Sequence, residues 1–166
     1  SDALTTAKIL AAVVQREPLT ELFMAATEST DGYTGTVPAQ VAALLGWTTL
    51  TFAKSVSVSD GNVCVRRQTE SGYDEIEAPL PAVVSVTAGV VVPRYPSFKG
   101  IMAAKSKPID IVSAADLGVS PVGWEGAGQS ILGVQTVDAR AGGEKFEDDG
   151  TAAEKIVAYL ANVKVI

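Results

Sequence analysis

The sequence predicts an α/β fold, and three stretches support this prediction. Residues 21–47 contain a short apolar run, a polar loop with two glycines, and then apolar residues at helical spacing, which is the order strand, loop, helix. Residues 52–67 alternate between the two sides of a strand around an Asp60-Gly61 turn, as a β-hairpin does. Residues 80–92 are rich in valine and predict a buried strand that returns to the main sheet.

The chain opens with a predicted helix. Asp2 is a suitable N-cap for a helix over residues 3–14, whose apolar stripe is formed by Leu4, Ala7, Leu10, Ala11 and Val14. Such a helix needs a sheet to cover, and the parallel strand that follows it needs neighbours. We therefore expect that the chain is a processed or truncated piece, or that further residues precede it.

Residues 21–47 carry the local signal for a ligand. The strand is predicted at residues 22–26 and the helix at residues 37–45, with Pro38 in its first turn and Gly46 suited to end it in a left-handed conformation. A loop at the carboxyl end of a parallel strand, followed by a helix N-terminus, is a place where phosphate binds. The glycines match neither the dinucleotide pattern nor the Walker loop, so an ordinary connecting loop is an equally good interpretation from the pattern alone.

The side chains of this loop favour binding over catalysis. Glu28 and Asp31 could do acid–base work, but capping the loop or accepting from a ribose hydroxyl is the simpler role, because no nucleophile, base and orienting partner occur together. Gly32 and Gly35 allow a positive φ and a close approach to a ligand. Three hydroxyls could donate to phosphate or could cap the loop, namely those of Thr30, Thr34 and Thr36.

Composition limits the function classes. The chain has 166 residues, of which 47% are hydrophobic, enough for one domain or for a domain and an arm. Its formal net charge of −6 argues against binding to nucleic acid or to an anionic membrane surface. Histidine is absent, so the usual neutral-pH base and the usual zinc ligand are missing. Cys64 is the single cysteine, so no intrachain disulfide can form, and a cytoplasmic location is expected. The longest apolar run, residues 78–93, is too short and interrupted to span a membrane.

Residues 93–100 predict a stiff loop that presents an aromatic side chain. Two prolines restrict its backbone, and Phe98 lies outside any strand or helix period, which makes it a candidate anchor for a partner's pocket. The alternative is that Phe98 folds back over a short helix predicted at residues 101–105 and forms a small satellite core. A last short strand is predicted at residues 109–112.

The end of the chain predicts an arm and a separate helix. Glycines recur between Gly123 and Gly143 without a helical or alternating period, which is typical of an extended connection. Thr151 and Glu154 have the spacing of a capping box, which would open a helix with an apolar face of Ile156, Val157, Tyr159 and Leu160. We therefore expect a nucleotide-binding domain over residues 1–118, and an arm and helix over residues 119–166 that pack on a partner subunit.

Several long stretches resemble the beta subunit of an electron transfer flavoprotein. They are ESTDGYTGTVPAQVAALLGW followed by TFAKSVSV, then LPAVVSV, PRYPSFKGIMAAKSKPI and AADLGV, and a closing AGGEKFEDDGTAAEKIVAYL. They occur in the family's order and cover nearly the whole chain, although the N-terminal third of the family, with its first strand, is absent. The resemblance implies a Rossmann-like, mainly parallel sheet with helices on both faces, an antiparallel hairpin excursion, and a C-terminal arm plus helix.

The resemblance also implies a function. The protein would be an electron carrier without substrate chemistry of its own, a bacterial, cytoplasmic heterodimer in which an alpha subunit holds or shares an FAD. The beta subunit would bind AMP or a second FAD, and dehydrogenases such as acyl-CoA dehydrogenases would donate the electrons. One alternative is a stand-alone adenine-nucleotide-binding module of the universal-stress-protein type, although such a module needs no arm with a detached helix. Another is a structural fragment that binds no ligand.

Two sets of residues follow from the resemblance, and neither contains a catalytic or metal-ligating group. The cofactor-binding set is Ala26, Thr27, Glu28, Ser29, Thr30, Asp31, Gly32, Tyr33, Thr34, Gly35, Thr36 and Val37. The partner-docking set is Arg94, Tyr95, Pro96, Ser97, Phe98, Lys99, Gly100, Ile101 and Met102. Within the second set, Phe98 stands where relatives often carry Leu.

Overall fold

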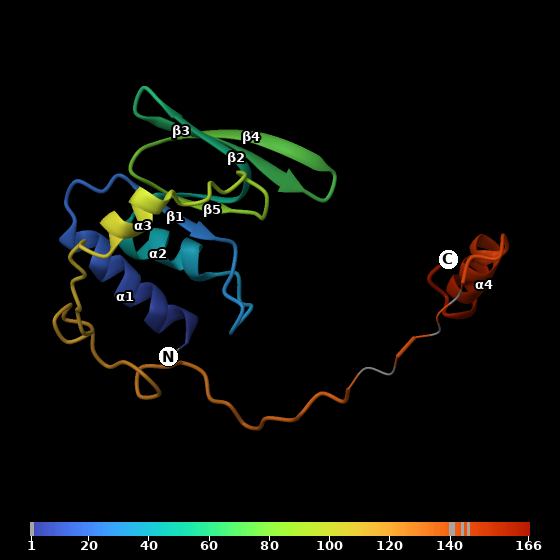
Figure 1. Ribbon diagram of the computed structural model, residues 1–166. Helices are drawn as coiled ribbons and strands as arrows, with labels where there is room; N and C mark the ends of the chain where they lie inside the picture. Colours follow the sequence, from blue (N-terminus) through green and yellow to red (C-terminus); the bar gives the residue numbers. More distant parts are fainter. Residues whose placement is uncertain (1, 140–141, 144, 146) are drawn as a thin grey trace. The chain divides into compact units, whose positions relative to one another are not determined.

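The computed structural model describes residues 2–139, 142–143, 145 and 147–166 (Figure 1). The chain divides into two compact units, Ser1–Ser130 and Ile131–Ile166, which are described separately. The second unit contains the helix α4 (Ala152–Asn162). The first unit contains, in order, α1 (Ala3–Arg16), β1 (Leu22–Ala26), α2 (Val37–Leu45), β2 (Thr48–Ser59), β3 (Asn62–Thr69), β4 (Gly72–Pro79), β5 (Ala82–Val86) and α3 (Phe98–Ala104).

Five strands of the first unit form one sheet in the order β1-β5-β2-β3-β4. The last strand in sequence, β5, lies between β1 and β2 and is parallel to both, so that Ala82 is opposite Leu22 on one side and Thr48 on the other. The strands β3 and β4 extend the sheet in antiparallel pairing. The predicted α/β class, with a Rossmann-like parallel core and an antiparallel hairpin, is confirmed.

The two faces of the sheet carry separate cores, because successive residues of a strand point to opposite faces. Val83 of β5 is fully buried against Ala7 of α1 and Val41 and Ala42 of α2. These two helices pack on each other and lie on the same side of the sheet (Figure 1). We expect helices on both faces of the sheet, and α1 and α2 cover the face that carries Val83. On the other face, Val84 packs with buried residues of the strands themselves: Leu50, Ala53, Val63, Val65, Ala78 and Ala82.

The strand β2 is longer than the predicted hairpin strand, because it changes partner along its length. Its first residues pair with β5 and its later residues with β3, and the register shifts on either side of Ala53. At the change, Phe52 adopts a φ of 60°. The Phe52 N–H donates to Ser85 Oγ at 3.0 Å, and the Thr51 carbonyl accepts from Arg67 Nε at 3.0 Å. Side chains thus satisfy the backbone groups that leave the strand ladder.

Three other predicted boundaries are wrong. The strand predicted over residues 80–92 is only β5, because the chain turns at Thr87, whose carbonyl accepts from Val90 N at 3.3 Å. Residues 109–112 form no strand, and their side chains are exposed. The short helix predicted at residues 101–105 begins earlier, at Phe98, because Ser97 Oγ accepts from Gly100 N and caps it.

In the second unit, α4 forms as predicted, but its predicted capping box does not. Thr151 makes no side-chain cap. The Thr151 hydroxyl donates instead to the carboxylate of Asp149, which also accepts from Thr151 N at 3.0 Å and from Lys155 Nζ at 2.8 Å. No residue of α4 is buried. None of the described helices combines the length and the apolar character that crossing a bilayer requires.

The start of α4 is expected to lose stability in acid. Hydrogen bonds from Lys155 and Thr151 lower the pKa of Asp149 from 3.8 to about 2. Because the pKa is lower in the folded state, the stabilisation is fully present above the unfolded value and is lost as the pH falls through about 2. An NMR titration of the full chain should place the Asp149 midpoint near 2, and Lys155→Met should raise it. A wild-type midpoint near 3.8 would contradict this assignment.

Candidate functional site

The predicted cofactor loop connects the carboxyl end of β1 to the start of α2. The first residue after β1 is fixed to the neighbouring strand, because Thr27 Oγ1 donates to the carbonyl of Val86 at the end of β5, at 3.1 Å. Further along, Tyr33 N donates to Ser29 O at 3.0 Å, which closes a turn. The loop therefore stands where two parallel strands end, which is the usual ligand position in an open α/β sheet.

The start of α2 offers backbone donors to this loop. Thr36 is the N-cap residue, and in the described part of the chain no side chain caps the helix and no acidic residue occupies its first turn. The first intrahelical bond runs from Gln40 N to Thr36 O at 3.0 Å, so the N–H groups before it have no partner within the helix. A helix start in this state has partial positive charge and suits an anion such as phosphate.

Two loop residues, Gly35 and Asp31, show local features of this loop. Gly35 has a φ of 62°, and a Cβ at this position would lie 3.7 Å from Glu28 Oε2. The hydroxyl of Ser29 and the N–H groups of Asp31 and Gly32 lower the pKa of the Asp31 carboxyl. Asp31 is thus an ionised acceptor within its own loop, as expected for a capping role. Among the described residues, no three His, Cys, Asp or Glu side chains gather closely enough to hold a metal ion.

Lys54, which belongs to neither predicted set, lies near the same edge of the sheet. Its Nζ donates to the carbonyl of Ala88 at 2.9 Å, in the turn that follows β5. A Cβ on Gly89 in this turn would lie 3.3 Å from the same Nζ. This places a positive charge beside the carboxyl end of β5. Local spacing does not indicate this position of the charge, because Lys54 lies in β2 beyond the point at which that strand changes partner.

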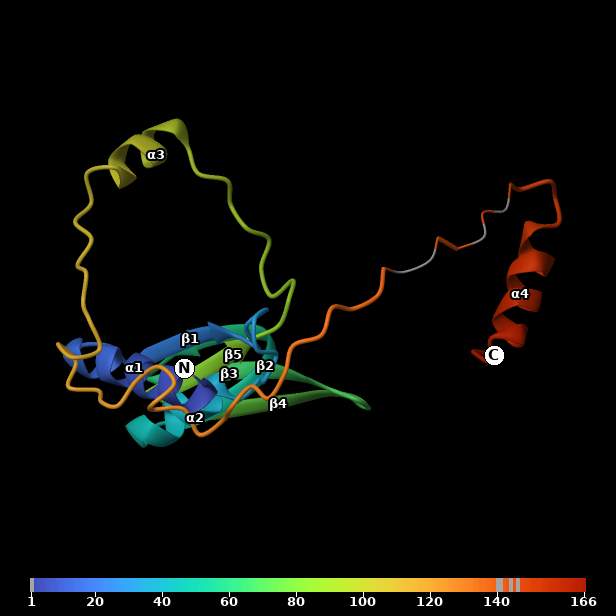
Figure 2. The same ribbon diagram turned by 90° about the horizontal axis from the view of Figure 1, so that it is seen from below.

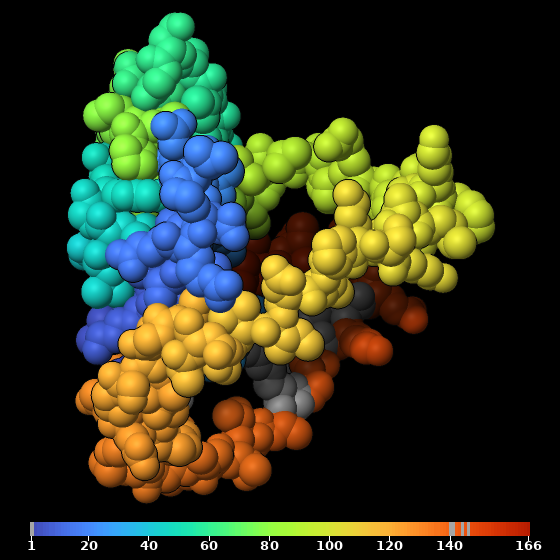
Figure 3. All heavy atoms as spheres, turned by 90° about the vertical axis from the view of Figure 1, so that its left-hand side faces the viewer, coloured from blue at the N-terminus to red at the C-terminus, as the bar shows by residue number. Residues whose placement is uncertain are grey.

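The predicted docking set lies elsewhere, around α3. Phe98 is the first residue of this helix and not part of an irregular loop, which corrects the prediction about its backbone. Its side chain is 80% exposed, and no residue of α3 is buried. Figures 2 and 3 show the yellow segment with α3 standing out from the sheet and its helices. This exposure argues against the satellite core that was the alternative.

The comparison with known proteins decides the family. Residues 1–117 match the family model of the electron transfer flavoprotein domain. The chain belongs to the electron transfer flavoprotein family. It is 42% identical over 168 residues to the electron transfer flavoprotein subunit beta of Mycobacterium tuberculosis, covering 100% of this chain and 63% of that protein. The resemblance to beta subunits found in the sequence is thereby confirmed.

More distant flavoprotein relatives show the same partial coverage. The caffeyl-CoA reductase-Etf complex subunit CarD of Acetobacterium woodii is 30% identical over 164 residues, which are 98% of this chain and 62% of that protein. The electron transfer flavoprotein subunit beta of Mus musculus is 32% identical over 160 residues, which are 96% of this chain and 59% of that protein. The chain therefore spans less than two thirds of the length of these curated relatives.

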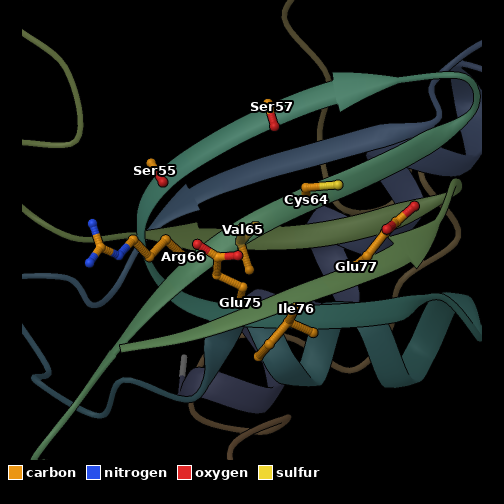
Figure 4. Close-up of a pocket in the computed structure, with 8 residues that line it drawn as sticks. All are labelled: Ser55, Ser57, Cys64, Val65, Arg66, Glu75, Ile76 and Glu77. Atoms are coloured by element: carbon orange, nitrogen blue, oxygen red, sulfur yellow. The ribbon is translucent and has the colours of Figure 1, made fainter. Parts of the chain in front are cut away.

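A groove of about 370 Å³ lies over the antiparallel strands, and none of its residues belongs to either predicted set (Figure 4). It is lined by Ser55 and Ser57 of β2, Cys64, Val65 and Arg66 of β3, and Glu75, Ile76 and Glu77 of β4. Asn62 Nδ2 donates to Glu77 Oε1 at 2.7 Å, and the Arg66 guanidinium lies 4.2 Å from the centroid of the Tyr73 ring. Two of its charged side chains thus already have partners within the chain.

Proposed function

We propose that the loop from Ala26 to Val37 binds the phosphate and ribose of an adenine nucleotide, either AMP or FAD. The observation that carries the proposal is the uncapped start of α2, which faces this loop at the carboxyl ends of β1 and β5. The N–H groups that have no partner within the helix would bind the phosphate, and the hydroxyls of Thr30, Thr34 and Thr36 would add donors. Family membership supports a nucleotide over other anions.

We further propose that the chain acts within a heterodimeric electron carrier. An alpha subunit would hold most of an FAD, and the flavin, when bound, supplies the electron-carrying chemistry. Residues of this chain would position that cofactor and exclude water from it. Dehydrogenases would donate the electrons and would dock on the set from Arg94 to Met102, whose exposed apolar side chains need a partner surface.

Replacing Gly35 by alanine is expected to weaken nucleotide binding. At its φ of 62° the added Cβ strains the backbone, and the relaxed loop no longer presents its N–H groups to phosphate. We expect about a tenfold rise in the Kd for AMP, corresponding to the loss of about one charge-assisted hydrogen bond. Isothermal titration of the full chain with AMP and with FAD measures it.

The matched control is Gly46→Ala at the other end of α2. Gly46 also has a positive φ, of 68°, and a Cβ there would meet nothing within 4 Å. The two variants therefore carry a similar backbone strain, but only the first is in the loop. Equal affinity for nucleotide in Gly35→Ala and wild type, or equal loss in both variants, would contradict the proposed site.

A further inference from the structure

A segment distant in sequence is attached to the N-terminal end of α1. Residues 121–128, called the strap here, run beside that end of the helix in both views of the ribbon (Figures 1 and 2). The Thr5 hydroxyl donates to Gly126 O at 2.9 Å, and Gly128 N donates to Asp2 Oδ2 at 2.8 Å. Thr5 is only 1% exposed, which is unusual for a polar side chain on the first turn of a helix.

The Asp2 carboxylate, the Thr5 N–H and the Thr5 hydroxyl take part in three bonds, one that joins the two residues and two that reach the strap. Asp2 Oδ1 accepts from Thr5 N at 2.8 Å, which is the ordinary N-cap bond, while Oδ2 is left for Gly128. Thr5 uses its N–H for the cap and its hydroxyl for Gly126. An N-cap needs only one acceptor atom. The second carboxylate oxygen of Asp2 and the hydroxyl of Thr5 are therefore available to bind the strap.

The strap itself has a shape that admits this contact. A Cβ on Gly126 would lie 2.2 Å from the carbonyl oxygen of Pro121 and 2.7 Å from its carbon, so the backbone folds back on itself more closely than any side chain permits. Ala127 N donates to Trp124 O at 3.4 Å within the same turn. The strap is therefore a closed turn that presents Gly126 O and Gly128 N to the helix together.

We propose that Asp2 and Thr5 form a clamp that holds the strap on α1 and thereby sets the point from which the chain beyond Ser130 leaves the first unit. The two bonds span sequence separations of 126 and 121 residues, so they close the first unit from end to end. The helix α3, which precedes the strap, has no buried residue with which to hold the chain. Releasing the clamp would lengthen the loop that follows β5 and increase the space that its end explores.

Two substitutions test the clamp by separate routes. Thr5→Val keeps the shape of the side chain and removes the hydroxyl that reaches Gly126. Asp2→Ser keeps one oxygen to cap the helix and removes the second acceptor. Thr6→Val is the matched control, because the Thr6 hydroxyl donates at 2.9 Å to the carbonyl of Asp2, the N-cap residue, and not to the strap.

Amide hydrogen exchange on the full chain gives the readout. We expect the Gly128 amide to exchange about tenfold faster in Thr5→Val and in Asp2→Ser, because local opening of the strap becomes easier while the helix stays folded. Exchange in α1 should be unchanged in Asp2→Ser, and Thr6→Val should match wild type throughout. Unchanged Gly128 exchange in Asp2→Ser, or equal acceleration in Thr6→Val, would overturn the clamp. If Thr5→Val unfolds α1, the Gly128 exchange rate in Asp2→Ser alone decides whether the clamp exists.

Discussion

Deleting residues 151–166 is expected to abolish association with the alpha subunit while the first unit stays folded. The helix α4 carries apolar side chains that its own unit leaves open, with Tyr159 50% exposed and no residue buried. An apolar helix face of this kind requires cover, which we propose the alpha subunit supplies. Every core residue that is buried in the described part of the chain precedes Ser130, so the deletion removes none of them.

The deletion is expected to weaken association with the alpha subunit strongly. Loss of a whole apolar face tethered by an arm should raise the Kd of the heterodimer at least about a hundredfold, because the lost anchor residues dominate such interfaces. Tyr159→Ala should give part of that loss without shortening the chain, and Glu154→Ala is its control on the same helix. Binding is measured with purified alpha subunit, and folding by the melting temperature. Unchanged affinity in the deletion would contradict the role of α4 in association. A collapse of the melting temperature would show instead that α4 belongs to a local core.

Replacing Phe98 by alanine is expected to weaken docking of the dehydrogenase by about 1–3 kcal/mol, the range for truncating an interface anchor. The melting temperature should stay nearly the same, because the side chain is 80% exposed and α3 buries no residue. The measurement is the rate of electron transfer from the dehydrogenase at varied concentrations of the heterodimer. The expected change lies in the concentration dependence, while the flavin content stays unaltered.

Ile109→Ala provides the control for this variant. Ile109 is an apolar side chain of similar exposure, 85%, and lies outside the predicted docking set. Its truncation should affect neither docking nor stability. Normal electron transfer in Phe98→Ala together with a marked loss of stability would contradict the docking role and favour a packing role for this side chain.

The parts of the fold that were predicted correctly are those whose signals are local. The helix α2 has its predicted bounds, because Pro38 suits its first turn and Gly46 ends it in a left-handed conformation. Asp2 caps α1 as predicted, through its bond to Thr5 N. In each case the residue that sets the boundary lies within a few positions of it.

The parts that were predicted wrongly depend on pairing or on competition between residues. The valine-rich run continues past Val86, but the strand ends there, because the chain turns at Thr87. Thr151 has the spacing for a cap but makes none, because its hydroxyl donates to the Asp149 carboxylate instead. Such outcomes depend on geometry in space that periodicity does not record.

The candidate site was predictable only as a stretch of sequence. Its loop could be located between β1 and α2, but the bond from Thr27 to Val86 and the place of Lys54 beside Ala88 depend on β5 lying between β1 and β2. The contact of Asp2 with Gly128 was likewise out of reach, because it joins the two ends of the first unit. Long-range contacts of this kind follow from the topology and not from local spacing.

The central claim is that this chain holds an adenine nucleotide within a flavin-containing heterodimer. Its most direct test is to co-purify the chain with its alpha subunit, record the visible absorption, and identify the nucleotides released on denaturation by mass spectrometry. We expect a flavin spectrum and a stoichiometric release of AMP or FAD attributable to this chain, with the release reduced in Gly35→Ala. A colourless chain that purifies alone with adenine nucleotide, or a complex whose beta subunit releases none, would contradict the claim.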